Sequence, residues 1–203
     1  GPNTWRNYYQ SVSTGRDEFD FSGTNFEALP DLTTDYKFTN HANFRNCTFR
    51  RLGLVGAELY QGADFSNCTI VDSSHICGRG STEGYIRLHH AKFCSDVMFD
   101  SSQQALEFSD CTFARDLRFT GQFRNGITFG APRSRVAGRL VSDRSEFFGA
   151  VEFSDIEVLA TENGGLLKEP AANFRKCKFN SSAKFERTWF HGIATLTSAE
   201  FCD

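Results

Sequence analysis

Large apolar residues recur along the chain at an interval that fits neither an α-helix nor an ordinary half-buried strand. When the chain is aligned on a repeated Phe or Ile, successive positions lie 20 to 23 residues apart, except for two intervals of 34 and 32 residues. The aligned column consists of Phe26, Phe49, Ile70, Phe93, Phe113, Phe147, Phe179 and Phe201. A period in this range is typical of a solenoid, in which each turn of the chain stacks on the previous one.

Three further columns accompany the first. Positions five residues earlier are apolar in seven of eight cases, positions two residues earlier are always small, and positions six residues later are always apolar. Large side chains five residues apart, each preceded by a small one, predict short extended segments separated by corners. Four such segments would close one turn, so we expect an all-β parallel solenoid of about eight coils.

The repeated units resemble the pentapeptide-repeat family, whose motif is Ala, Asp or Asn, Leu or Phe, and two variable residues. The units that carry the resemblance are Ala42-Asn43-Phe44-Arg45-Asn46, Cys47-Thr48-Phe49-Arg50-Arg51, Ala57-Glu58-Leu59-Tyr60-Gln61 and Ala63-Asp64-Phe65-Ser66-Asn67. The resemblance extends over residues 19–203 and implies a right-handed quadrilateral parallel β-helix. Steps of six residues and the two long intervals depart from the family's regular form, so we expect some corners to be bulged or looped.

The two ends of the chain differ from the repeats. Residues 1–18 comprise Gly1-Pro2, which resembles the remnant of a cleaved tag, and a segment for which we predict a short capping helix over residues 4–14. The last coil stops at Phe201-Cys202-Asp203 without a polar cap. We therefore expect the chain to be part of a longer protein, with an adjoining domain or a homodimer contact at this coil.

The two long intervals predict two loops that interrupt the repeats. About twelve surplus residues are assigned to 120–139 and about ten to 156–170, both of which contain Gly and Pro. Smaller bulges are predicted at 30–35 and 78–84. Inserted loops on a rigid scaffold are the first places where binding residues are expected.

Composition adds few candidates for chemistry. The chain has 203 residues, a net charge of −3, 22 Phe and seven Cys, and it has no apolar run long enough to span a membrane. Cys47, Cys68, Cys111 and Cys177 occupy the column of small inward residues, whereas Cys77, Cys94 and Cys202 are expected to face outward. No cysteine or histidine has zinc-site spacing, so we expect reduced thiols, no metal or other cofactor, and a cytoplasmic domain, with attachment to a membrane-anchored protein as the alternative.

Arginine is concentrated in one part of the chain. Residues 115–144 contain seven Arg and two Asp, a local charge of +5 that leaves −8 for the rest. The candidate partner-binding residues are Arg124, Arg133, Arg135, Arg139 and Arg144. Their guanidinium groups suit recognition of carboxylates or phosphates, and we place them in and beside the first loop.

Three functional hypotheses follow. The first is a non-catalytic, rigid interaction module that binds a protein partner through its walls and loops. The second is implied by the resemblance alone, since some pentapeptide-repeat proteins mimic DNA and regulate type II topoisomerases; this function requires a continuous acidic face. The third is a β-helical carbohydrate-active enzyme, which requires clustered carboxylates, but the outward Asp and Glu residues are spread over nearly every coil. Direct nucleic-acid binding is not expected from a chain with no basic excess.

Overall fold

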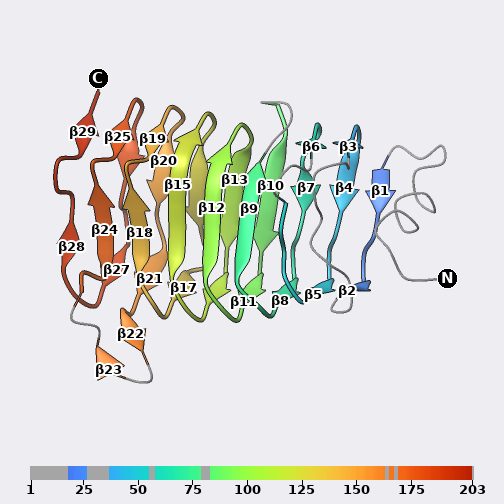
Figure 1. Ribbon diagram of the computed structural model, residues 1–203, viewed down its shortest axis with the longest axis horizontal. Coiled ribbons are helices and arrows are strands. Elements are labelled where there is room, and N and C mark those ends of the chain that lie inside the picture. The colour runs from blue at the N-terminus through green and yellow to red at the C-terminus, as the bar shows by residue number, and fades with distance from the viewer. Residues whose placement is uncertain are drawn as a thin grey trace.

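The computed structural model describes residues 18–26, 37–54, 58–78, 83–162, 165–166 and 169–202. Within these ranges the chain forms strands and no helix, and every strand pair except one hairpin is parallel. The strands follow one another along the long axis from β1 to β29 (Figure 1). The predicted all-β parallel solenoid is confirmed, while the capping helix over 4–14 and the bulge at 30–35 lie outside the described residues.

Two walls of the solenoid are sheets of eight strands each. Wall A contains β1 (Glu18–Asp20), β4 (His41–Asn43), β7 (Ala63–Asp64), β10 (Tyr85–His89), β13 (Ala105–Ser109), β16 (Ile127–Gly130), β20 (Val151–Phe153) and β26 (Ala183–Lys184). Wall B contains β2 (Asn25–Phe26), β5 (Thr48–Phe49), β8 (Thr69–Ile70), β11 (Lys92–Phe93), β14 (Thr112–Phe113), β17 (Ser134–Val136), β21 (Ile156–Val158) and β27 (Trp189–Phe190). We number the turns 1 to 8 by their wall A strand.

The other two walls share one sheet of nine strands. Wall C contains β18 (Leu140–Asp143), β24 (Ala172–Arg175) and β28 (Ala194–Thr195), and wall D contains β19 (Glu146–Phe147), β25 (Lys178–Phe179) and β29 (Glu200–Phe201). The longer strands β9 (Ser74–Gly78), β12 (Val97–Ser102) and β15 (Leu117–Phe123) run through both walls. In turns 1 and 2, β3 (Lys37–Phe38) and β6 (Glu58–Leu59) pair in the position of wall D.

Residues in the left-handed region of backbone space turn the chain from wall A to wall B. Asn46 and Asn67 both have φ of 59°, and Asp110 and Asp155 have φ of 52° and 53°. Asn and Asp tolerate this conformation better than other residues with a side chain, because their short polar groups bond to the local backbone. The polar residues next to each small inward residue are therefore corner residues.

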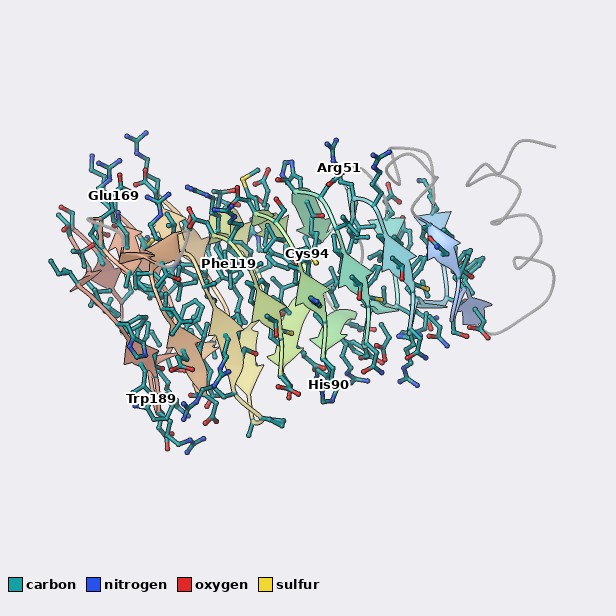
Figure 2. All side chains as sticks on the ribbon, turned by 90° about the horizontal axis from the view of Figure 1, so that it is seen from below. Arg51, His90, Cys94, Phe119, Glu169 and Trp189 are labelled. Carbon is teal, nitrogen blue, oxygen red and sulfur yellow. The ribbon has the colours of Figure 1, made fainter. Side chains whose placement is uncertain are left out.

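Phenylalanine rings stack from turn to turn inside the walls. The rings of Phe44 and Phe65 have centroids 4.8 Å apart and an interplanar angle of 1°, and those of Phe108 and Phe129 are 4.4 Å apart at 7°. These separations are close to the spacing of neighbouring strands, so equivalent side chains lie directly above one another. Figure 2 shows one such ring, that of Phe119, within the solenoid. The repeated Phe is thus explained by columns of stacked rings in the core.

The predicted first column is correct as far as Phe113 and wrong beyond it. Phe113 stacks on Phe93 with centroids 5.0 Å apart, but its neighbour in the next turn is Val136 and not Phe147. Wall B continues through Val158 to Phe190. The other predicted members of the column belong to wall D, where Phe147 pairs with Phe179 and Phe179 with Phe201. The predicted column moves by half a turn from wall B to wall D because both walls carry the same local pattern of a small residue two positions before a large one, as in Cys111-Thr112-Phe113 and Ser145-Glu146-Phe147.

The same half-turn shift accounts for the first predicted loop, which is wrong. Residues 120–139 contain the end of β15, all of β16 and all of β17, so they form most of a regular turn. The interval of 34 residues from Phe113 to Phe147 is one turn plus half of the next, not a turn with an insertion.

The second predicted loop contains a real insertion. Between wall B and wall C of turn 7, β22 (Thr161–Glu162) and β23 (Gly165–Leu166) pair antiparallel and project from the solenoid (Figure 1). β21 and the residues up to Leu159 still belong to the turn. The insertion therefore begins later than predicted, and of the bulge at 78–84 only the flanks are described.

Cysteine suits the column of small inward residues because its side chain is small and because its thiol donates a hydrogen bond. The Sγ atoms of Cys47 and Cys68 donate to the carbonyl oxygens of Phe21 and Phe44 in the preceding turns, at 3.2 and 2.9 Å. Ser145 places a hydroxyl in the equivalent role on Phe119, at 3.1 Å. These thiol and hydroxyl groups thus each donate to a corner carbonyl oxygen of the preceding turn.

All seven cysteines are free in the structure. Burial raises the pKa of the Cys111 thiol to about 12, which keeps it protonated as a donor. The prediction for the outward cysteines is only partly correct: Cys202 is exposed and Cys94 half-buried, but Cys77 is buried and its Sγ lies 3.6 Å from the carbonyl oxygen of Ser101. The bulge in β12 at this corner covers Cys77.

Candidate functional site

The five candidate arginines lie at different corners of the solenoid rather than in one loop. Arg124 follows wall D of turn 5, Arg133 and Arg135 enter wall B of turn 6, Arg139 precedes wall C, and Arg144 follows it. They form a belt around one turn because every few residues the chain turns onto another wall. Only Arg133 and Arg135 are brought together at one surface.

Arg139 is a structural residue. Its Nε and one terminal nitrogen bond to Oδ2 of Asp116 at 3.0 and 2.7 Å, and its backbone N–H bonds to Oδ1 at 2.8 Å. Arg118 adds a fourth bond to Asp116 at 2.6 Å, and Glu169 forms an ion pair with the other side of Arg139. These bonds tie turns 5 and 6 and the base of the hairpin together, so Arg139 is not available to a partner as Arg133 is.

Arg124 and Arg144 occupy separate corners. The Arg124 guanidinium lies 4.6 Å from the centroid of the Phe148 ring. Arg144 has φ of 56° at the corner between walls C and D. Among the described residues, no hydrogen-bond acceptor contacts either guanidinium. Since these two arginines lie on different walls from Arg133, they do not contribute to one binding surface with it.

Arg133 stacks on an exposed tryptophan. Its guanidinium carbon lies 3.4 Å from the ring centroid of Trp189, which belongs to wall B of turn 8 and is 42% exposed. Figure 2 shows Trp189 at the outer edge of the C-terminal part, opposite the edge that carries Glu169. We refer to Arg133, Arg135 and Trp189 as the arginine–tryptophan cluster.

Acidic residues of turn 7 hold the surroundings of this cluster in place. Glu157 accepts a bond from Nε of Arg135 at 3.0 Å and pairs with Nε2 of His191 at 3.1 Å. Asp155 accepts two bonds from Arg187, at 2.9 and 2.7 Å. Because the partners come from turns 6, 7 and 8, this network connects three neighbouring turns on the outer face of wall B.

Two of these carboxyl groups have pKa values below the ordinary range. Burial alone would raise the pKa of Glu157, but the bonds from His191 and Arg135 outweigh it and lower the pKa. The bonds from Arg187 lower the pKa of Asp155. Both side chains therefore stay ionised at neutral pH and keep their cationic partners in place.

Comparison with known proteins adds no name to this site, since no family model, curated protein or solved structure matches the chain. Within the described ranges, no three His, Cys, Asp or Glu side chains are grouped so that they could hold a metal ion. The described part of the chain also has no helix of the length and apolar character needed to cross a membrane.

Trp189 is a residue of this cluster that the sequence pattern did not reveal. The available signal was a large aromatic residue directly before Phe190, at a position that a strand directs outward when its neighbour points inward. The half-turn error in the predicted register hid this signal, because Phe190, which packs partly against the core, was not assigned to an inward column. The contact with Arg133 spans turns 6 to 8 and has no counterpart in local sequence.

The C-terminal coil exposes apolar side chains. Ile193, Leu196 and Phe201 are 67%, 49% and 57% exposed, while Phe185 and Phe190 pack partly against the core. A homodimer or an adjoining domain at this coil stays a prediction.

Acid should destabilise the fold through the paired carboxylates. Burial opposes ionisation of Asp116, but the bonds from Arg139 outweigh this effect and hold its pKa below the ordinary 3.8. A folded-state pKa below the unfolded value means that the native state binds fewer protons, so this contribution is present above pH 3.8 and disappears as the pH falls through and below it. We expect the free energy of unfolding, measured by urea titration, to fall on acidification from pH 5 to pH 3. The fall should be smaller in Asp116→Asn; equal slopes for the two proteins would contradict the role of this carboxyl.

Proposed function

We propose that this chain is a non-catalytic, rigid interaction module that binds a protein partner through the outer face of wall B in turns 6 to 8. The observation that carries the proposal is the Arg133–Trp189 stack, in which a guanidinium and an exposed indole are held together on a wall fixed by strand pairing. Trp and Arg are the residues most enriched among those that dominate protein–protein binding energy.

The rigidity of the scaffold supports this reading. Arg135 is tied to turn 7 through Glu157, and Trp189 pairs in register with that same residue. Side chains already ordered in the free protein lose less conformational entropy when a partner binds. A surface of this kind needs no rearrangement to present its binding groups.

The charge pattern of the walls favours an interaction module over DNA mimicry. Outward residues of wall B are Asn25, Thr48, Thr69, Lys92, Thr112, Arg135, Glu157 and Trp189. On wall A, the acidic Asp64 and Glu107 are interleaved with Arg87, which contacts both. Neither column forms the continuous acidic face that mimicry of a DNA backbone needs.

The repeat units remain the basis for relating this chain to the pentapeptide-repeat family. The four-walled parallel solenoid supports that relation, which we retain as part of the proposal. The corner geometry and the small inward column give the repeated residues a structural explanation, so their recurrence does not require a catalytic role.

Affinity capture from a host lysate, followed by mass spectrometry, tests the proposal. The bait variant combines Arg133→Glu with Trp189→Ala, and the control is Arg144→Glu, which makes the same charge change on another wall. We expect the partner to be retained by the native chain and the control but reduced about 30-fold with the double variant, as for loss of a dominant contact. Arg139→Glu is unsuitable as a test because it also breaks the bonds to Asp116.

Two capture results would count against the proposal. Recovery of the same proteins by the native and double-variant baits would show that the partner does not bind through the outer face of wall B in turns 6 to 8. Recovery of a type II topoisomerase by all baits would instead favour DNA mimicry.

A further inference from the structure

A cavity of about 440 Å³ opens on wall B between turns 5 and 6. It is lined by Asp110, Cys111, Thr112, Arg133 and Arg135. Its volume lies in the range of pockets that hold small ligands.

The cavity arises from a longer corner in turn 6. Elsewhere the inward residue of wall A lies five positions before that of wall B, as Phe108 does before Phe113, but seven positions separate Phe129 from Val136. Arg133 belongs to this longer corner and directly precedes β17. The space lies between this longer corner and residues 110–112 of turn 5.

The contact with Trp189 orients the guanidinium of Arg133 without using its N–H groups in hydrogen bonds. The stack on Trp189 fixes the plane of its guanidinium, and no acceptor among the described residues takes a hydrogen bond from it. A guanidinium with its face covered and its N–H groups open can bind an oxyanion in a bidentate manner.

Arg135 and Thr112 supply further donors on the same side. These two residues are direct neighbours in the pairing of β14 with β17. Only Nε of Arg135 is engaged, by Glu157, and the side chain is 68% exposed. Its terminal N–H groups and the Thr112 hydroxyl have no acceptor among the described residues.

Nearby acids are already engaged by other cations. Asp155 is bound by Arg187, and Glu157 by Arg135 and His191. The one acid that lines the cavity, Asp110, has its Oδ2 2.9 Å from Nδ1 of His90. Two arginines and one carboxylate thus line the cavity, and the carboxylate has its own partner.

We propose that this cavity binds a phosphoryl group, as free phosphate or as a phosphate ester on the protein partner, the second source resting on the proposed function. A carboxylate is satisfied by the fork of one arginine, whereas a tetrahedral, doubly charged group with three terminal oxygens can use both arginines and the threonine hydroxyl. Clusters of arginine are the usual means by which proteins recognise phosphorylated partners.

Titration with inorganic phosphate at constant ionic strength tests the ligand class. The Trp5→Phe chain leaves Trp189 as the sole tryptophan, and we expect its fluorescence to change saturably as phosphate binds beside Arg133. In isothermal titration calorimetry, Arg133→Gln and Arg135→Gln should each weaken binding about tenfold or more, the loss expected for a charged hydrogen-bond donor. Arg144→Gln should bind as the native chain does, and unchanged thermal melts show that the variants are folded.

Three results would overturn the proposal: no saturable binding at tens of millimolar phosphate, unchanged affinity in Arg133→Gln, or acetate and succinate binding as tightly as phosphate. The first result would indicate a crevice that binds no phosphate, the second an anion site that does not use Arg133, and the third a site for carboxylates.

Two further measurements distinguish free phosphate from a phosphate ester on a partner, and they separate the failure of this proposal from the failure of the proposed function. O-phosphoserine binding more tightly than phosphate supports an ester on a partner, and equal binding supports the free ion. If phosphatase treatment of the lysate leaves the Arg133-dependent capture intact and phosphate does not bind, the phosphoryl proposal fails and the interaction module stands. If phosphate binds but no Arg133-dependent partner is captured, the proposed function fails and the free-phosphate site stands.

Discussion

Replacing Phe129 by alanine should lower the free energy of unfolding by about 3 to 5 kcal/mol, the usual effect of truncating a fully buried phenylalanine. The Phe129 side chain is completely buried, with its ring centroid 4.4 Å from that of Phe108 and 5.6 Å from that of Phe153. A cavity at this position would separate turns 5, 6 and 7, and strand pairing prevents the walls from closing around it.

Guanidinium titration followed by far-ultraviolet circular dichroism measures the effect. Phe148→Ala is the matched control, because Phe148 is only half-buried and faces outward under Arg124. We expect the control to change stability by about 1 kcal/mol or less. Similar losses for the two variants would show that residues 120–139 do not form the turn described.

Removing the Asp116 side chain should be the second most damaging change, with an expected loss of about 2 to 4 kcal/mol for Asp116→Ala. This carboxylate accepts three bonds from Arg139 and one from Arg118, and its side chain is only 10% exposed. The variant would remove the Asp116 acceptor from the backbone N–H of Arg139 and from the guanidinium groups of Arg118 and Arg139, of which only the second keeps a partner in Glu169.

Asp143→Ala is the control for this prediction. Asp143 also binds an arginine through two bonds, from Arg175 at 3.1 and 2.9 Å, but both side chains are more than a third exposed. Exposed ion pairs contribute about 1 kcal/mol or less. Equal unfolding midpoints for the two variants would place Asp116 among ordinary surface pairs.

The solenoid could be predicted from the sequence because its signal is repeated. One Phe in the right place says little, but stacked positions such as Phe44, Phe65 and Phe108 share the same neighbours at the same offsets. The small inward residues add an independent column, and the resulting class of fold is confirmed. The insertion in turn 7 could be predicted for the converse reason, because the repeat pattern is interrupted there, but it was predicted as a loop over 156–170 and not as the hairpin of β22 and β23.

The assignment of residues to walls could not be predicted in the same way. Ser145-Glu146-Phe147 has the same local pattern as Cys111-Thr112-Phe113, although one segment lies on wall D and the other on wall B. A shift by half a turn therefore places equally suitable side chains in the core. Only the pairing of Phe113 with Val136 and of Phe123 with Phe147 distinguishes the two registers.

The candidate site could likewise be predicted only in part. Arginine composition identified Arg133 and Arg135, and the structure brings these two to one cavity but disperses Arg124, Arg139 and Arg144 over other corners. Neighbours in sequence separate because the chain changes wall every few residues.

The sequence by itself determined the periodicity and the stacked aromatic core, because these follow from residue types repeated at fixed offsets. The tertiary structure alone decided which turn meets which, and with it the contact of Arg133 with Trp189 across turn 7. The physical reason is that stacking energy depends on the kind of side chain at each position and hardly on which wall supplies it, whereas a surface site depends on the particular residues that the register brings together.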